Sequence, residues 1–252
     1  MTYVNRLLEA WQDGRTTLGA WAVFPGPGAE ALVRPGIDWV GLDLQHGLLG
    51  ADDLMTLAPA VAARGAAPIA RVAENDATVI GRALDSGAEG VIVPLVDDAA
   101  GAASAVAACR FPPRGGRSYG PSRFVLESGS WEPADVEKVA CIVMIETATG
   151  LRNVEEIART PGVDAILIGP SDLAIALGRP PATTHEDGQV QEAITAIQAA
   201  AVDAGIVAGI VCPDGTVARP YVVAGFRMVV VAIDFGLLSA GAAAQLEAAQ
   251  GR

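Results

Sequence analysis

Eight short apolar segments recur along the chain, each ending at a polar residue or a glycine and followed by an alanine-rich stretch. They are rich in Val and Ile and almost continuously apolar, without alternation between apolar and polar positions. Strands that are buried on both faces of a parallel sheet have this pattern. The eight predicted strands are residues 18–24, 39–44, 68–72, 90–96, 141–145, 165–168, 206–211 and 228–233.

The stretches between these strands are typical of helices, so the chain alternates between strand and helix as α/β proteins do. Examples of predicted helices are residues 51–64, 77–86, 99–109, 153–159 and 189–204. A doubly wound open sheet would also alternate in this way, but eight strands in 252 residues favour a closed (β/α)8 TIM barrel. Residues 4–12 are predicted to form an extra helix that closes the bottom of the barrel. Because no linker or low-complexity stretch divides the chain, we expect residues 1–252 to form one TIM-barrel domain.

One connection between predicted strands is much longer than the others. It runs from residue 97 to residue 140 and contains, after a predicted helix, the irregular segment FPPRGGRSYGPSR at residues 111–123. A long irregular loop in a compact domain is usually functional. We therefore expect this segment to be an active-site loop or a subunit-contact loop.

Composition and charge restrict the class of partner. The chain carries 29 acidic and 17 basic side chains, a formal net charge of −12. Nucleic acids and anionic membranes are bound by clustered Lys and Arg, so neither is expected as a partner. No uncharged run reaches the roughly 18 apolar residues of a spanning helix, and residues 1–6 have no apolar signal core. Cys109, Cys141 and Cys212 are scattered and odd in number, which indicates reduced, buried thiols in a cytoplasmic protein.

Polar residues recur at the carboxyl ends of the predicted strands, which is where βα barrels carry their chemistry. They are Asp43 at the end of the second strand and His46 after it, Arg71 at the third, Glu146 after the fifth, Gly169-Pro170-Ser171-Asp172 after the sixth, and Asp234 after the eighth. Burying a charged group is costly unless it is paired or bound to a metal. We therefore expect these groups to compensate one another or to bind something charged.

Glu146 and Asp172 are the candidate metal ligands, because carboxylate oxygens select hard divalent cations. Two carboxylates plus water molecules leave open positions for a bidentate substrate. The purely structural alternative is that Glu146 pairs with Arg71 and that Ser171 and Asp172 cap a helix. The coincidence of all these groups at strand ends favours the functional interpretation. Free N–H groups at the start of a helix after Gly169 would also offer a seat for a carboxylate.

The chain contains only two histidines. His185 lies among polar residues and is predicted to be at a solvated helix start. His46 follows an apolar strand and precedes Gly47, so its imidazole could reach the barrel mouth and exchange protons near neutral pH. A lone histidine in such a place is more often structural. A catalytic role for His46 is therefore inferred only together with the other polar residues at the strand ends.

The order and spacing of these residues resemble the class II pyruvate aldolase family, also called the HpcH/HpaI or 4-hydroxy-2-oxoheptanedioate aldolase family. The resemblance covers nearly the whole chain. Its matching pieces are residues 18–21 (LGAW), 38–46, Arg71, 83–88 (ALDSGA), Pro94, 110–115 (RFPPRG), Glu146 and 169–173 (GPSDL).

The resemblance implies a reversible, metal-dependent carbon–carbon lyase that cleaves 4-hydroxy-2-oxo acids. The products would be an aldehyde and pyruvate or a related 2-oxo acid such as hydroxypyruvate. Glu146 and Asp172 would hold the divalent cation, Mg²⁺, Mn²⁺ or Co²⁺. His46, oriented by Asp85, would be the acid/base group, and Arg71 would stabilise the enolate of pyruvate.

The same resemblance implies how substrates bind and how subunits assemble. Gly169, Pro170, Ser171 and Asp172 would hold the substrate carboxylate through their backbone. Trp21 would shape the aldehyde pocket. Apart from the resemblance, we expect loops at the barrel mouth to select the aldehyde, with Trp21, Val211, Cys212, Pro213 and the loop at residues 117–123 as the candidate groups. The family is similar in forming homohexamers, dimers of trimers, in which a C-terminal helix, here residues 241–250, packs on a neighbouring subunit.

Two positions depart from the family pattern. Gln45 stands where well-studied members have Glu, and Met144 stands where they have Gln. Both changes bear on the substrate range and the preferred metal more than on the reaction class.

Two other functions remain open at this point. One is a lyase on the same barrel that acts on a CoA thioester of the malyl or citramalyl type, or that decarboxylates oxaloacetate. The chain is short for a CoA enzyme and has no evident basic pocket for the adenine nucleotide. The other is a barrel that binds an acidic metabolite without catalysis, which a base near two metal carboxylates disfavours.

Overall fold

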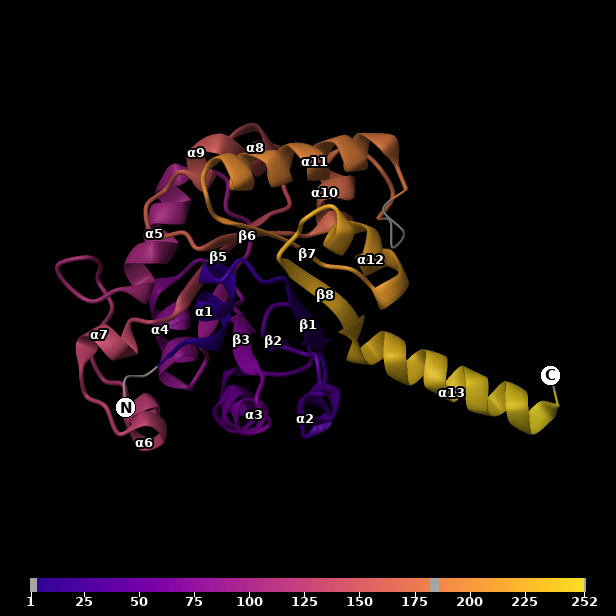
Figure 1. Ribbon diagram of the computed structural model, residues 1–252, viewed down its shortest axis with the longest axis horizontal. Coiled ribbons are helices and arrows are strands. Elements are labelled where there is room, and N and C mark those ends of the chain that lie inside the picture. The colour runs from indigo at the N-terminus through magenta and orange to yellow at the C-terminus, as the bar shows by residue number, and fades with distance from the viewer. Residues whose placement is uncertain (1–3, 182–185, 252) are drawn as a thin grey trace.

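The strands form a closed parallel barrel in chain order, with β8 paired back to β1 (Figure 1). This computed structural model describes residues 4–181 and 186–251. The strands are β1 (Thr17–Ala22), β2 (Trp39–Asp43), β3 (Ala67–Arg71), β4 (Gly90–Val93), β5 (Ala140–Ile145), β6 (Ala165–Ile168), β7 (Val207–Ile210) and β8 (Met228–Ile233). The predicted TIM barrel is confirmed, and the open doubly wound sheet is wrong because β1 pairs with both β2 and β8.

Helices connect successive strands on the outside of the barrel, while α1 precedes β1 and α13 follows β8. In the described residues they are α1 (Arg6–Gln12), α2 (Gly28–Leu32), α3 (Ala51–Ala63), α4 (Ala77–Asp85), α5 (Ala99–Cys109), α6 (Ser122–Ser128), α7 (Pro133–Val136), α8 (Ala148–Arg152), α9 (Val154–Ala158), α10 (Pro170–Ala176), α11 (Gly188–Asp203), α12 (Gly215–Val223) and α13 (Asp234–Gln250). One predicted strand, residues 90–96, ends early at Val93. Pro94 follows it, and a proline has no N–H to continue the ladder.

The core has an inner and an outer layer. The outer layer, between strands and helices, consists of Val, Ile, Leu and Ala. The inner layer fills the barrel with inward-facing side chains, among them Trp21, Trp39, Ile69, Ile92, Ile142, Met144, Leu167, Met228 and Val230. A Cβ at Gly41 would lie 2.5 Å from the Trp21 ring, so glycine on β2 leaves the space that this indole occupies.

Helix α1 closes the amino-terminal end of the barrel, as predicted. Leu7 and Trp11 belong to the inner layer, and the Trp11 indole N–H donates to the Thr17 hydroxyl at 3.1 Å. Asn5 caps the helix and its amide also donates to the Glu89 carbonyl at 2.6 Å, which ties α1 to the start of β4.

The long connection after α5 also lies at the amino-terminal end, because α5 returns the chain from the end of β4 to the start of β5. Within it, Arg117 is buried, pairs with Asp85 at 2.7 Å and has its guanidinium carbon 5.2 Å from the centre of the Phe111 ring. The expectation that residues 117–123 line the barrel mouth is therefore wrong within one chain. Their role in subunit contact stays a prediction.

The cysteines behave as the sequence predicts: Cys109, Cys141 and Cys212 are buried and form no disulfide. No helix in the described part of the chain is both long and apolar enough to cross a membrane. His185, predicted at a solvated helix start, lies outside the described residues.

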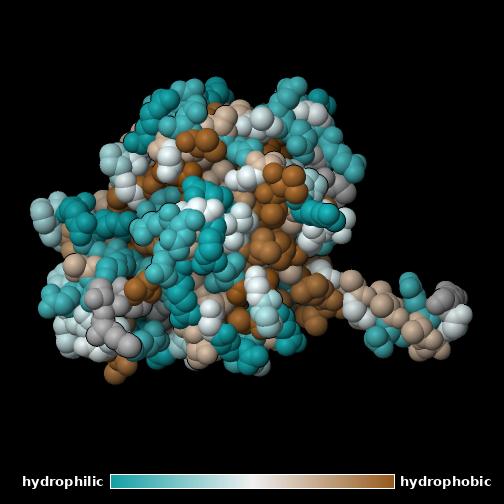
Figure 2. All heavy atoms as spheres, viewed as in Figure 1, coloured by the Kyte–Doolittle hydropathy of each residue, from teal (hydrophilic) through white to brown (hydrophobic). Residues whose placement is uncertain are grey.

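Helix α13 leaves the barrel and extends away from it (Figure 1). Its large apolar side chains Phe235, Leu237, Leu238 and Leu246 are 53–63% exposed. Figure 2 shows hydrophobic atoms gathered where this helix departs. Only Asp234 of this helix is buried.

Glu89, near the start of β4, should make stability depend on pH. Burial raises the pKa of Glu89 to about 7, from an ordinary 4.5, although Arg6 at 3.5 Å lowers it. The folded protein therefore binds the proton of the Glu89 carboxyl more tightly than the unfolded chain does. The contribution of this protonation to folding stability is complete below pH 4.5 and is lost as the pH rises through about 7. Its full size is on the order of 3 kcal/mol.

The variant Glu89→Gln should remove this dependence. We expect its free energy of unfolding in urea to exceed that of the wild type at about pH 8 but not at about pH 5. Glu155→Gln, at an exposed ion pair with Arg159, is the matched control and should change neither value. Parallel pH profiles for the wild type and Glu89→Gln would refute the assignment.

Candidate active site at the carboxyl ends of the strands

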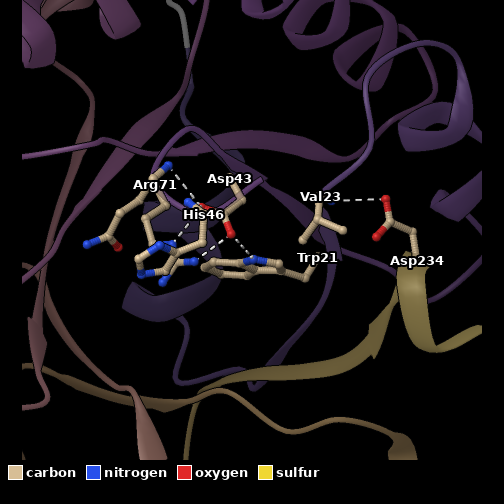
Figure 3. Close-up of polar contacts among 7 residues, drawn as sticks. Trp21, Val23, Asp43, His46, Arg71 and Asp234 are labelled. Atoms are coloured by element: carbon tan, nitrogen blue, oxygen red, sulfur yellow. Dashed lines mark hydrogen bonds and ion pairs between the residues drawn. The ribbon is translucent and has the colours of Figure 1, made fainter. Parts of the chain in front are cut away.

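Asp43 is the centre of a hydrogen-bonded cluster at the ends of β1, β2 and β3. It faces Arg71 across the β2–β3 register, and Arg71 donates to both of its oxygens, from Nε at 2.8 Å and from Nη2. The Trp21 indole N–H donates to the same carboxylate at 3.2 Å (Figure 3). The Arg71 guanidinium carbon also lies 5.1 Å from the centre of the Trp21 ring. The position and orientation of the Arg71 charge are therefore fixed.

The same carboxylate shapes the turn that carries His46. The backbone N–H groups of Gln45 and His46 both donate to Asp43 Oδ1 at 3.1 Å, and the His46 residue is exposed at the mouth. Burial alone would raise the pKa of Asp43, but its bonds to Arg71, the charge of Arg71 and the bonds from His46 and Trp21 outweigh burial and lower it. Asp43 thus stays ionised opposite Arg71. The sequence marks Asp43 only as a polar strand end, and its role follows from the register.

Glu146 lies just after β5 and is 3% exposed. Its Oε1 accepts from the Leu95 N–H at 2.9 Å, and Leu95 adopts a left-handed φ of 55° to make that turn. On its other side, a Cβ at Gly169 would lie 2.6 Å from Oε2. The glycine therefore leaves the space that the carboxylate fills, and Glu146 is held between the turns that follow β4 and β6.

Asp172 is in the first turn of α10 and is exposed at the same end of the barrel. Burial raises the pKa of Glu146; the Leu95 N–H lowers it, the charge of Asp172 raises it, and Arg71 lowers it. The two carboxylates therefore lie close enough to interact electrostatically. The predicted cap by Ser171 and Asp172 is wrong, since Gly169 is the N-cap residue and no side chain bonds there.

The purely structural alternative for Glu146 is also wrong, because Arg71 pairs with Asp43. Glu146 has no ion-pair partner among the described residues, although it is buried. A buried carboxylate beside a second carboxylate, in a cradle formed at a glycine, is a donor set that fits a hard divalent cation. Within residues 4–181 and 186–251, no three His, Cys, Asp or Glu side chains lie together in a way that could bind a metal ion. Further ligands would be water or substrate.

Four other predicted site residues lie as follows. Trp21 is 4% exposed and forms part of the floor beneath Arg71. Val211 follows β7 at the mouth, and its N–H donates to the Ile168 carbonyl at 3.1 Å. Gly169 and Pro170 are buried at the start of α10, beside Glu146.

Asp85 is not near His46 within one chain. It is the last residue of α4, which runs from the mouth to the amino-terminal end, and there it pairs with Arg117 at 2.7 Å. The prediction that Asp85 orients His46 is therefore not met by one copy of the chain. The reason is the direction of the helix, which the residue motif alone does not reveal.

The two departures from the family pattern both lie beside the site. Met144 is 1% exposed inside the barrel, and its Cε would lie 3.1 Å from a Cβ at Gly169, so it packs under the carboxylate of Glu146. Gln45 precedes His46, and its Oε1 is buried without a hydrogen-bond partner in the described structure.

Comparison with known proteins agrees with this geometry. The family described as HpcH/HpaI aldolase/citrate lyase matches residues 28–240. A hydroxypyruvate/pyruvate aldolase of Rhizorhabdus wittichii is 38% identical over 95% of this chain and 96% of its own length. A 2-dehydro-3,6-dideoxy-6-sulfogluconate aldolase of Pseudomonas putida is 37% identical over 93% of each chain.

Solved structures show the same relationship. The crystal structure of an HpcH/HpaI aldolase/citrate lyase family protein from Burkholderia cenocepacia superposes with a TM-score of 0.90. Its sequence is 31% identical, and the match covers 98% of this chain and 100% of that one. The chain therefore belongs to the HpcH/HpaI aldolase/citrate lyase family.

Proposed function

We propose that this protein is a metal-dependent aldolase that reversibly cleaves 4-hydroxy-2-oxo acids into an aldehyde and pyruvate or hydroxypyruvate. The observation that carries the proposal is Arg71, fixed by Asp43 at the end of the barrel where Glu146 and Asp172 also lie. A guanidinium group in a fixed position, near two carboxylates that could bind a metal, suits a reaction whose intermediate is an enolate. The names of the two relatives, both aldolases, support the same class.

Glu146 and Asp172 would hold the divalent metal ion. When bound, a divalent metal supplies Lewis-acid stabilisation to the keto oxygen of a 2-oxo acid. Arg71 would place its positive charge against the oxygen that becomes negative, and because Asp43 already holds it, it need not reorganise during the reaction. The amides at the start of α10, at Ser171 and Asp172, would hold the substrate carboxylate, since the first N–H groups of a helix have no partner within it.

His46 would move the protons. In the synthetic direction it takes a proton from C3 of the 2-oxo acid, and the carbanion then forms a bond to the aldehyde carbon while the aldehyde oxygen receives a proton. In the cleavage direction it takes the proton of the C4 hydroxyl, the C3–C4 bond breaks, and C3 is protonated. The turn fixed by Asp43 presents His46 at the mouth for both steps.

The proposal is tested by deuterium exchange at C3 of pyruvate, followed by mass spectrometry. Metal-stripped protein should show background exchange only, and added Mg²⁺, Mn²⁺ or Co²⁺ should restore fast exchange. No metal-dependent exchange would refute the enolate mechanism. Aldol addition should then be compared for pyruvate and hydroxypyruvate as donors with short aldehydes as acceptors.

The runner-up is a lyase for a CoA thioester of the malyl type, or an oxaloacetate decarboxylase. It is kept because the family description includes citrate lyases. Cleavage of malyl-CoA, or decarboxylation of oxaloacetate, faster than aldol cleavage under the same conditions would replace the aldolase proposal.

We propose further that the protein is a homo-oligomer, expected as a hexamer, in which α13 packs on another copy. Support comes from the exposed leucines and Phe235 of α13 and from Asp85, which can approach a His46 only in another copy. Replacing Leu237 and Leu238 by Ser should shift the mass in sedimentation equilibrium to smaller species, because exposed apolar patches mark contacts between proteins. An unchanged mass would contradict this role of α13, and Ile175→Ser, exposed on α10, is the control.

A further inference from the structure

Asp234 is a buried carboxylate that joins the end of β8 to the turn after β1. It is 5% exposed, and its Oδ2 accepts from the backbone N–H groups of Val23 at 3.0 Å and Phe24 at 3.1 Å. Its Oδ1 accepts from the Phe235 N–H at 2.7 Å. Figure 3 shows the carboxylate reaching toward Val23 from the start of α13. No Lys or Arg pairs with it among the described residues.

The three amides explain why the charge is tolerated there. A buried carboxylate is costly unless its oxygens are satisfied, and bonds from N–H groups to an ionised acceptor are strong. The amides of Val23 and Phe24 are therefore committed to Asp234, and β1 stops at Ala22 although the apolar run continues to Phe24. The carboxylate thus fixes the shape of the turn.

This turn borders the mouth. Trp21, two residues before Val23, pairs in register with Ile233, which precedes Asp234. The Val23 carbonyl accepts from the Leu48 N–H at 2.6 Å, two residues after His46. The rings of Phe24 and Phe235 lie 6.3 Å apart. One carboxylate therefore holds together the turn after β1, the start of α13 and, through Val23, the far end of the His46 turn.

The enolate-forming groups also have anchors of their own: Asp43 holds Arg71 and the His46 amide, and the Leu95 N–H holds Glu146. Arg71 is the last residue of β3, Glu146 directly follows β5, and Asp172 lies in the helix after β6. A 2-oxo acid bound to these groups would occupy the β3–β6 side of the mouth. The second substrate must then lie on the remaining side, formed by β7, β8, β1 and β2, which includes the turn that Asp234 holds.

We propose that Asp234 is a positioning residue for the acceptor aldehyde: it fixes the turn after β1 as the wall against which the aldehyde binds. The inference rests on the proposed aldolase function. It assigns Asp234 to the second substrate and not to the formation of the enolate. Because Asp234 also begins α13, the position of this helix and the shape of the aldehyde wall are linked.

The test separates the two substrates. Asp234→Ala should raise the KM for the aldehyde about tenfold or more, because a small displacement of a positioning group is enough to lose that much. Metal-dependent exchange at C3 of pyruvate should stay within about twofold of the wild type, since Asp43 still holds Arg71 and His46. Asp234→Asn keeps one acceptor oxygen and should recover part of the loss, and it serves if the alanine variant does not fold.

The control is Asp76→Ala, which removes a carboxylate bonded to two amides, of Thr78 and Val79, at the start of α4. It should change neither parameter. An unchanged aldehyde KM in both Asp234 variants, or an equal loss of exchange and aldol addition, would overturn the inference.

A second readout does not need activity. Hydrogen exchange at the amides of Val23 and Phe24 should accelerate in Asp234→Ala and not in Asp76→Ala, and unchanged protection would also overturn the inference. If the wild type shows no C3 exchange, the proposed function fails on that result alone. The hydrogen-exchange result would still decide whether Asp234 holds the turn.

Discussion

Replacing Arg71 by Ala should lower the metal-dependent rate of C3 exchange in pyruvate by about 10²–10³-fold, the loss seen when a fixed oxyanion donor is removed. The reason is that Arg71 offers a charge whose position is already set by Asp43 and by the Trp21 ring. Arg71→Lys should recover little, because an ammonium group cannot make the paired bonds of a guanidinium. The measurement is the initial rate of deuterium incorporation at saturating metal and pyruvate.

Two further variants sharpen this result. Arg152→Ala, on the exposed end of α8, is the control and should behave as the wild type. Asp43→Asn should also slow exchange. The double variant with Arg71→Ala should be slowed by less than the product of the two single effects, because both changes disrupt the same pair of Arg71 and Asp43. Exchange that survives in Arg71→Ala would show that this guanidinium does not face the enolate.

Replacing Glu146 by Gln should weaken metal binding by more than the roughly 10–100-fold lost with a partner outside the direct ligands, because Glu146 would bind the metal itself, and exchange should fall to the metal-free background. Glutamine can still accept from the Leu95 N–H, so the shape of the site is kept while the charge is lost. The metal-free variant should be at least as stable as the metal-free wild type, because burial raises the pKa of Glu146 and so disfavours its ionised form. Calorimetric titration with Mn²⁺ and thermal unfolding with and without metal measure the two effects.

Asp172→Asn should weaken metal binding as well, since it removes the second carboxylate from the mouth. Glu156→Gln, in the first turn of α9, is a control that removes one acidic charge away from the mouth. Tight Mn²⁺ binding in Glu146→Gln, with stabilisation equal to that of the wild type, would exclude Glu146 as a ligand.

The barrel could be predicted because its strands are buried on both faces, and this burial leaves continuous apolar runs that the sequence displays. The ends of the strands are less predictable where a distant group decides them. Residues 23–24 continue the apolar run of β1, but their amides bond to Asp234, 211 residues away for Val23. Nothing in the local sequence shows that these two residues form a turn and do not continue the strand.

The candidate site was predictable in part for the same reason. Arg71, Glu146 and His46 follow apolar runs, and parallel strands bring such ends together. The partner of Arg71 was not predictable, since Asp43 is 28 residues away and only the β2–β3 register makes them neighbours. Asp85 shows the opposite error: its motif suggests a role beside His46 but does not reveal that α4 carries the residue to the amino-terminal end of the barrel, where it pairs with Arg117.

The most direct test of the account is a crystal soaked with Mn²⁺ and pyruvate, with data collected to show the anomalous signal of the metal. The account predicts one strong peak within coordination distance of the carboxylates of both Glu146 and Asp172, with pyruvate between that peak and Arg71. A peak that contacts neither carboxylate, or no peak at saturating Mn²⁺, would contradict it.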